Sequence, residues 1–306
     1  MRISTQSFYE QSKSAMSSLQ SNLLRTQQQL GAGTKILAPS DDPLGATRAL
    51  SVSQSIALNA QYAASRAHTT QSLSMEENAL KSVTDVLQDV KTQLIEAGGT
   101  MSDADRANIA TTLQSNLDHL QGLANTDDGN GQFLFAGFKS GTAPFVRQSD
   151  GSISYVGDQG QRLSQVDVSR QMASTDDGLR IFQHAGTDVF ATLNTVITAL
   201  KTPVDNAGAP AQAVLMSALG SANREITTAH DNVLTVRSSV GSRMNELESL
   251  NVVGDNRTLS DKSYLSDLQD LDYGSAIAEF YQRQTALQAS QQTFVKVQHI
   301  ALFNYL

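Results

Sequence analysis

The chain has no cysteine and no tryptophan, and only 17% of its 306 residues are charged. Without cysteine it can form no disulfide, has no thiolate nucleophile and offers no cysteine ligand to zinc. The formal net charge is −8, and no run of lysine and arginine is longer than two residues, which argues against binding a phosphate backbone. These absences exclude cysteine chemistry and make nucleic acid an unsuitable partner.

Long apolar runs are missing as well. No stretch approaches the ~20 apolar residues that cross a bilayer. The opening segment MRISTQSFYEQSKSAMSSLQ lacks the apolar run of a secretory signal. We therefore expect a soluble protein with no membrane partner, which does not use the usual cleaved signal if it leaves the cell.

Glutamine is abundant, with 28 copies, and heptad patterns are long. Near the N-terminus, large apolar residues fall on alternating three- and four-residue steps, with Ser12 and Thr26 filling the gaps. These apolar residues are Tyr9, Met16, Leu19, Leu23 and Leu30. The narrow stripe predicts a coiled-coil helix that needs a partner helix and ends at Gly31 and Gly33.

The last segment repeats two kinds of side chain at intervals of seven. The apolar residues are Phe280, Leu287 and Phe294, flanked by Ile277 before them and by Leu302 and Phe303 after them; the glutamines are Gln284, Gln291 and Gln298. A buried glutamine must find hydrogen-bond partners for its amide, which weakens a simple two-helix seam. The repeat therefore predicts that several helices pack together and share hydrogen bonds.

The middle of the chain contains two further helical seams and one segment in which the spacing of apolar residues changes from helix-like to strand-like. A helix is expected from Pro43 to Ala97, with leucines every seven residues in its later half, and another seam covers 226–250 with Arg243 as its one misfit. We expect both to be the buried faces of a self-contained helical bundle. Between about 130 and 183 the runs GQFLFAGF, DGSISYVGD and QVDVSRQM are typical of β-hairpins.

Pairing the first helix with the last is the simplest arrangement of these segments. It predicts a mainly α fold with a β-rich insert, an elongated rod that carries the β domain at its far end. The domains expected are a terminal coiled-coil domain (1–42 and 274–306), a helical rod domain (43–130 and 186–273) and a β-rich outer domain (131–185). The terminal stripes bury too little apolar area to offset the ordering of two long helices. We therefore expect these helices to become rigid only among sister copies.

The stretch APSDDPLGATRAL places two acids directly before a proline. Asp42 precedes Pro43 and so avoids the helical region, while aspartate is a favourable N-cap and proline a favourable first helical residue. Asp41 adds negative charge near the positive end of the helix dipole. No histidine or further acid lies nearby to complete a catalytic or metal site, so we interpret these three residues as a joint between two helices.

Other candidate chemistry is weak. TDDGNGQF resembles a calcium loop, but Gly137 stands where the bidentate glutamate belongs, so a turn entering a hairpin is the better interpretation. The five histidines have no ligand spacing, and no nucleophile elbow, phosphate-binding loop or dinucleotide fingerprint occurs. We predict no catalytic residue, no metal and no cofactor.

Three segments together resemble the bacterial flagellin superfamily, and more closely the hook-associated protein 3 family of the hook–filament junction. They are LGAGTKILAPSDDPLGATRAL, ALQASQQTFVKVQHIALFNYL with its LFNYL ending, and GQFLFAGFKSGTAPF followed by YVGD. True flagellins usually have Asp-Asp-Ala-Ala where this chain has Asp-Asp-Pro. GAGTKI departs from the commoner Ser-Gly-Lys-Arg form, which reduces the basic character of the turn.

The resemblance implies a non-enzymatic structural subunit that is exported unfolded through the flagellar type III apparatus. Its implied partners are identical subunits in a ring, hook-associated protein 1, flagellin, and a cytoplasmic export chaperone at the C-terminal region. Terminal helices would form an inner tube, with the β domain outward. Two alternatives stay open at this point: a flagellin of the filament, and a cytoplasmic coiled-coil adaptor.

Overall fold

The computed structural model describes residues 2–184, 186–205 and 207–303, with side chains described between residues 7 and 298. The chain divides into two compact units: a terminal unit of residues 1–59 and 255–306, and a central unit of residues 60–254. Both divisions fall inside continuous helices. The three-domain division expected from the sequence stays a prediction.

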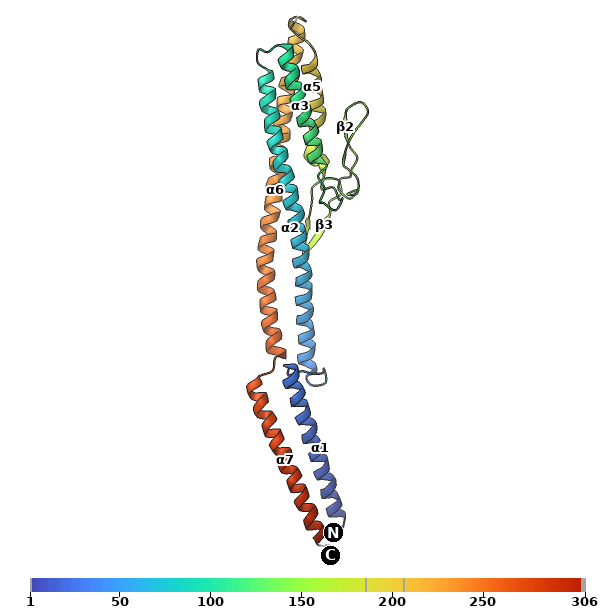
Figure 1. The fold of residues 1–306 in the computed structure, drawn as a ribbon, viewed down its shortest axis with the longest axis vertical. Helices are drawn as coiled ribbons and strands as arrows, with labels where there is room; N and C mark the ends of the chain where they lie inside the picture. The colour runs from blue at the N-terminus through green and yellow to red at the C-terminus, as the bar shows by residue number, and fades with distance from the viewer. Residues whose placement is uncertain (1, 185, 206, 304–306) are drawn as a thin grey trace. The chain divides into compact units, whose positions relative to one another are not determined.

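Helices dominate the chain, and the strands lie in one insert (Figure 1). In order, the elements are α1 (Arg2–Ala32), α2 (Pro43–Ala97), α3 (Asp103–Ala124), β1 (Phe145–Arg147), β2 (Ile153–Tyr155), β3 (Leu163–Asp167), β4 (Arg170–Ala173), α4 (Gly178–Phe182), α5 (Val189–Lys201), α6 (Ala209–Gln269) and α7 (Tyr273–Phe303). The prediction of a mainly helical chain with a β-rich insert is confirmed, and α2 has the bounds that the sequence predicted.

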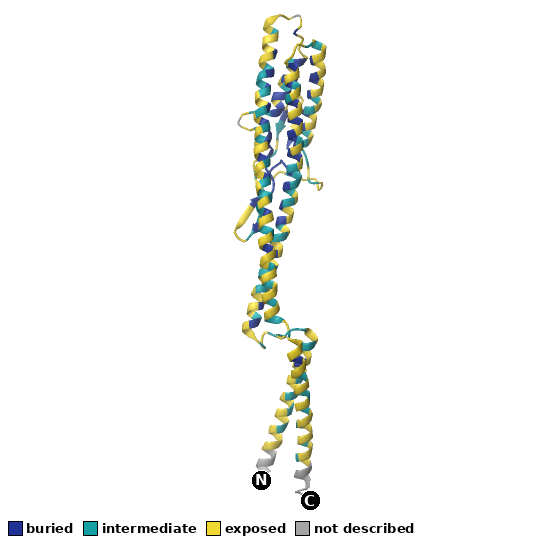
Figure 2. Cartoon of the chain, turned by 90° about the vertical axis from the view of Figure 1, so that its left-hand side faces the viewer, coloured by how far each residue is buried: buried dark blue, intermediate teal, exposed yellow. Residues whose placement is uncertain are grey.

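The central unit holds the hydrophobic core, where most of the buried residues lie (Figure 2). Every apolar position of the predicted seam in α2 is buried: Leu73, Leu80, Val83, Leu87, Val90, Leu94 and Ala97. These side chains join the buried faces of α3, α5 and α6 in one cluster. The prediction that the middle seams belong to a self-contained bundle is therefore confirmed.

The β-rich insert forms two antiparallel hairpins instead of one sheet. β1 pairs with β2 and β3 pairs with β4, with a register shift between Gln165 and Asp167. Asn125 at the end of α3 holds the first hairpin, because its side chain exchanges two hydrogen bonds with the backbone of Phe145, at 2.8 and 2.9 Å. Arg66 of α2, almost completely buried, donates to the carbonyl of Val166 in the second hairpin at 3.0 Å.

The run GQFLFAGF is not a strand, which corrects the expectation for residues 131–138. Its backbone turns, with Gly137 at φ +68°, and contacts several separate segments: Leu134 N donates to the Thr126 carbonyl and Gly178 N to the Phe135 carbonyl. Leu134 and Phe135 are buried in the core. The apolar run therefore reflects burial of an irregular segment and not a sheet.

The same kind of turn explains the calcium-like sequence. The Asp128 side chain accepts from the backbone N–H groups of Asn130 and Gln132, at 2.9 and 3.1 Å, and Asp127 bridges to Phe133. Because two N–H groups already bind it, the carboxylate serves the turn, and its pKa is lowered chiefly by the bond from Asn130. Among the described residues, no group of three or more His, Cys, Asp or Glu could hold a metal ion.

Arg243, the misfit of the α6 seam, belongs to a buried polar cluster. Its guanidinium forms an ion pair with Asp176 and donates to the Ala173 carbonyl at 3.1 Å. The backbone N–H of Asp176 donates to a carboxylate oxygen of Glu76, which is fully buried on α2, at 3.2 Å. Burial, and then the charge of Asp176, raises the pKa of Glu76 to about 8. The arginine thus interrupts the apolar seam because it compensates a buried acid.

Candidate assembly surface and helix joint

The terminal unit begins with α1, which ends at a glycine in the left-handed region. Gly33 has φ +73°, and its N–H donates to the carbonyl of Gln29 at 2.8 Å. A Cβ at this position would lie 2.9 Å from the Tyr273 hydroxyl of α7. Conformation and close approach both favour glycine here.

Asp42 lies directly before α2 and caps it. Its Oδ1 accepts from the backbone N–H of Gly45 at 2.9 Å, which satisfies one of the free donors of the first turn. A Cβ at Gly45 would come 2.3 Å from the Asp42 carboxylate and 2.9 Å from the Ile36 side chain. The compact turn before α2 therefore depends on Asp42, Pro43 and Gly45 together.

Asp41 binds a different set of groups. One carboxylate oxygen accepts from the backbone N–H groups of Leu37 and Ala38, at 3.1 and 3.2 Å. The other lies 3.0 Å from the guanidinium of Arg25 on α1. Asp41 thus closes the loop and ties it to α1, a contact that the sequence did not suggest.

The break between α6 and α7 lies beside the break between α1 and α2. Lys35 N donates to the carbonyl of Gln269 at 2.8 Å, and Leu271 N donates to that of Gly33 at 3.0 Å. The ammonium group of Lys35 donates to the Asp267 carbonyl at 2.6 Å. These bonds join the two breaks into a single structure, which we call the helix joint (residues 33–43 and 267–275).

Asp272 performs for α7 the role that Asp42 performs for α2. Its carboxylate accepts from the hydroxyl of Ser275 at 2.8 Å and from the backbone N–H of Gly274 at 2.9 Å. These bonds, led by that from the Ser275 side chain, lower the pKa of Asp272. The sequence patterns did not single out Asp272, although an aspartate directly before a Tyr-Gly-Ser helix start was a visible capping signal.

α1 and α7 pack as an antiparallel pair (Figure 1). On α1, the side facing α7 is the stripe that the sequence predicted. Met16, Leu19, Leu23 and Leu30 are half-buried, and Thr26 is fully buried. Near the other end of the pair, the rings of Tyr9 and Phe294 lie 5.3 Å apart between centroids.

On α7, the positions with reduced exposure follow a different heptad line from the glutamines. They are Ala276, Phe280, Arg283, Leu287, Ser290, Phe294 and Val297. Gln284 is half-buried, Gln291 and Gln298 are exposed, and 45% of Ile277 is exposed. The structure therefore brings Phe280, Leu287 and Phe294 onto the α1–α7 seam and leaves the glutamine line mostly outside it.

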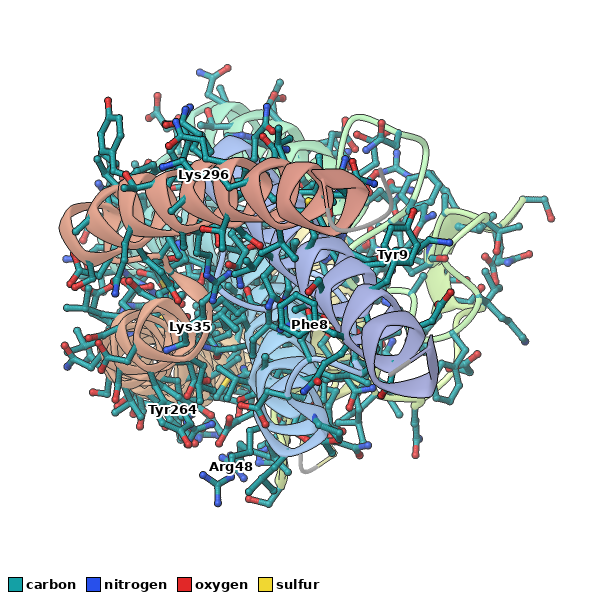
Figure 3. The ribbon with its side chains drawn as sticks, turned by 90° about the horizontal axis from the view of Figure 1, so that it is seen from below. Phe8, Tyr9, Lys35, Arg48, Tyr264 and Lys296 are labelled. Carbon is teal, nitrogen blue, oxygen red and sulfur yellow. The ribbon has the colours of Figure 1, made fainter. Side chains whose placement is uncertain are left out.

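The terminal unit buries very little apolar side chain. Among its described residues, the buried apolar ones are Ala49 and Ala276, and every larger apolar side chain keeps some exposure. Phe8 and Tyr9, labelled on α1 in Figure 3, are 49% and 43% exposed. The side chains of Leu302 and Phe303 lie outside the described residues.

Few charges lie on this pair of helices. Among the described side chains they are Glu10, Lys13 and Arg25 on α1 and Glu279, Arg283 and Lys296 on α7. Arg25 is paired with Asp41 and Arg283 with Glu279. Because burying an unpaired charge is costly, an exposed but weakly charged surface suits later burial better than permanent contact with water.

None of the helices in the described part of the chain is long and apolar enough to cross a membrane.

Two family models match the chain at its two ends. The bacterial flagellin N-terminal helical region matches residues 3–140, and the bacterial flagellin C-terminal helical region matches residues 224–306. Flagellar hook-associated protein 3 of Escherichia coli and that of Salmonella typhimurium are each 39% identical to the chain over 317 residues, covering 99% of both partners in the comparison.

Solved structures share the fold. A flagellar hook-associated protein of Vibrio parahaemolyticus is 24% identical with a TM-score of 0.68, covering 75% of this chain and all of that one. The flagellar junction protein FlgL of Legionella pneumophila is 17% identical with a TM-score of 0.62, covering 72% of this chain and 99% of that one.

Proposed function

The chain belongs to the family of flagellar hook-associated protein 3, a structural component of the flagellum at the hook–filament junction, and we propose that it assembles there through its terminal unit. One observation carries this proposal. The terminal unit has long, paired helices, but its described residues include no large apolar side chain that is buried. A single copy leaves this apolar surface in water, and neighbouring copies would cover it.

Two stripes of α7 have separate roles in this proposal. Phe280, Leu287 and Phe294, with Leu302 and Phe303 beyond them, supply apolar packing in the assembled structure. Met16, Leu19, Leu23 and Leu30 supply it from α1. Gln284, Gln291 and Gln298 lie mostly outside the seam and exchange amide hydrogen bonds with helices of other copies, and Ile277 adds an apolar contact beside them. Uncharged amides suit this role because they can be satisfied on burial without a counter-ion.

The helix joint fixes how the terminal helices continue into α2 and α6. Asp42 and Pro43 set the start of α2, Asp41 ties the loop to α1, and the backbone pairing of Gly33–Lys35 with 269–271 links both breaks. We propose that each copy therefore presents its terminal helices at the same angle within its own terminal unit, which a regular assembly requires.

The proposed partners are a ring of identical subunits, hook-associated protein 1 on one side and flagellin on the other. Before export through the type III apparatus, in an unfolded state, a cytoplasmic chaperone binds the C-terminal region. The outer hairpins face away from the assembled tube. Nucleic acid, membrane and catalysis have no part in this function.

Replacement of a seam residue tests the proposal. In cells that lack the native gene, Phe294→Asp should abolish attached filaments and motility and release flagellin into the medium, because a charge would enter an apolar contact. Val214→Asp, at a largely exposed position of α6 in the central unit, is the matched control and should restore motility. Full motility with Phe294→Asp would show that this stripe is not buried on assembly.

A further inference from the structure

The apolar residues of the α1–α7 seam are compatible with more than one register of the two helices. On α1 the apolar positions Leu23 and Leu30 repeat after seven residues, and so do Phe280, Leu287 and Phe294 on α7. When both helices repeat with the same period, sliding one along the other by seven residues again places apolar side chains against apolar side chains. Apolar packing alone therefore distinguishes poorly between the observed register and its neighbours.

One layer of the seam is different, because it is polar on both helices. Thr26 of α1 is fully buried, and Arg283 is the only charged residue on the seam line of α7 within the described residues. The Arg283 Nη1 group donates to the Thr26 hydroxyl at 2.6 Å and to the carbonyl of Asn22 at 2.8 Å. The guanidinium thus spans the space between the helices and binds α1 at two points.

Thr26 and Arg283 each also form a hydrogen bond within their own helix. The Thr26 hydroxyl donates to the Asn22 carbonyl at 3.1 Å, which leaves its lone pairs free to accept from Arg283. The Nη2 group of Arg283 donates to Glu279, one turn earlier on α7, at 2.5 Å. Since the hydroxyl and the guanidinium are each oriented within their own helix, little further ordering is needed when they meet.

A shift of seven residues removes this fit. Arg283 would then face either Leu19, an apolar side chain in the seam, or Gly33, which lies beyond the end of α1. In the first case the guanidinium would be placed against apolar surface without a side-chain acceptor, which is strongly unfavourable. In the second it would leave the helix pair.

We propose that Arg283 and Thr26 set the register of α1 against α7, so that every copy of the chain pairs its terminal helices in the same alignment. They act as a positioning pair and not as the main source of stability, since polar seam residues select one alignment at some cost in stability. The register belongs to the paired state of α1 and α7 within one chain, so the ratio of two cross-linked products reports it even where these helices open often in the free chain. It bears on the proposed function because copies with different registers would present different surfaces to their neighbours.

The absence of cysteine from the sequence allows a direct test of register. Tyr9→Cys with Phe294→Cys marks the observed register, because these rings are in contact. Tyr9→Cys with Leu287→Cys marks the register shifted by seven residues. Each purified full-length double variant is treated with a short thiol-specific cross-linker in dilute solution, and the intramolecular product is quantified.

We expect the first pair to cross-link far more than the second. Adding Arg283→Met or Thr26→Val to both pairs should lower the ratio of observed to shifted product by roughly tenfold, the loss expected for hydrogen bonds to a charged group. Thr26→Ser keeps the hydroxyl and should keep the ratio. Gln282→Met, at an exposed neighbouring position, is the matched control for the added apolar side chain.

Two results would overturn the proposal. If the ratio stays unchanged in both Arg283→Met and Thr26→Val, apolar packing alone sets the register. If both products disappear together, the pair controls whether the helices associate and not how they align. Because the assay uses one chain alone, its outcome is separate from that of the motility test with Phe294→Asp.

Discussion

At the scale of single residues, the most informative positions are polar groups in apolar surroundings. Arg243 interrupts an otherwise apolar seam, and the structure explains it through the buried carboxyl groups of Asp176 and Glu76. Thr26 and Arg283 interrupt the terminal seam in the same way. In both places the departure from the heptad pattern marks a specific contact between distant segments.

Glu76 makes the stability of the chain depend on pH. Burial and the charge of Asp176 raise its pKa in the folded state to about 8, from an ordinary value near 4.5, with Arg243 partly opposing the shift. The folded chain therefore retains a proton that the unfolded chain has released, and the free energy of unfolding should fall as pH rises from about 4.5 to about 8. The expected slope is up to about 1 kcal/mol per pH unit.

Urea unfolding of the full chain at several pH values between 5 and 9 measures this slope. Glu76→Gln, which imitates the protonated side chain, should flatten it. Glu248→Gln, at an exposed position of α6, should leave it unchanged. An equal slope in the native chain and in Glu76→Gln would show that Glu76 does not hold this proton.

Removing the cation from the same cluster should be more damaging. Arg243→Met would leave Asp176 buried without its guanidinium, and we expect a loss of about 3–5 kcal/mol in the free energy of unfolding. Adding Asp176→Asn should recover part of this loss, because the uncompensated charge is then gone. Denaturant unfolding of the two single variants and the double variant measures the coupling, and strictly additive losses would contradict it.

At the scale of elements, the helix joint shows how local sequence ends one helix and starts the next. Gly33 ends α1, Asp42 caps α2 and Asp272 caps α7, each through bonds to nearby backbone groups. The order Asp-Asp-Pro was enough to predict where α2 starts, because capping depends on residues next to one another. The pairing of the two breaks was not predictable, because their residues are far apart in sequence.

Removing the Asp42 N-cap should destabilise only the first turn of α2. Asp42→Ala removes the acceptor for the Gly45 N–H and should cost about 0.5–2 kcal/mol. Hydrogen exchange should accelerate in the first turn of α2 and stay unchanged in the core seam around Leu87. Asp42→Ser, which keeps a capping oxygen, is the control. Equal exchange in Asp42→Ala and the native chain would argue against this cap.

At the scale of the whole molecule, the two units differ in how much apolar surface they bury. The central unit has a continuous core, whereas the described residues of the terminal unit bury only Ala49 and Ala276 among apolar side chains. Average composition does not reveal this contrast. The heptad pattern does, because a narrow stripe on two helices cannot enclose a core.

This contrast predicts that backbone amides of the free chain are unevenly protected from hydrogen exchange. Before assembly, amide hydrogens of α1 and α7 in dilute solution should exchange much faster than those of α3 and of the part of α2 around Leu80, because little burial holds the terminal pair. After incorporation into flagella the same amides should become protected. Terminal helices as strongly protected as the centre in a dilute monomer would contradict the expected coupling of folding to assembly.

The sequence alone determined the bounds of α2, the middle seams and the stripe on α1, because each depends on residues a few positions apart. The tertiary structure decided which stripe of α7 meets α1. Neighbouring positions on a helix differ by about 100°, so the line of Arg283 and the line of Gln284 are both continuous stripes in the sequence. Only the partner helix selects between them, and here the acceptors at Asn22 and Thr26 lie opposite Arg283. The sequence also did not reveal the cluster of Glu76, Asp176 and Arg243, because its members come from three segments that only the tertiary structure brings together.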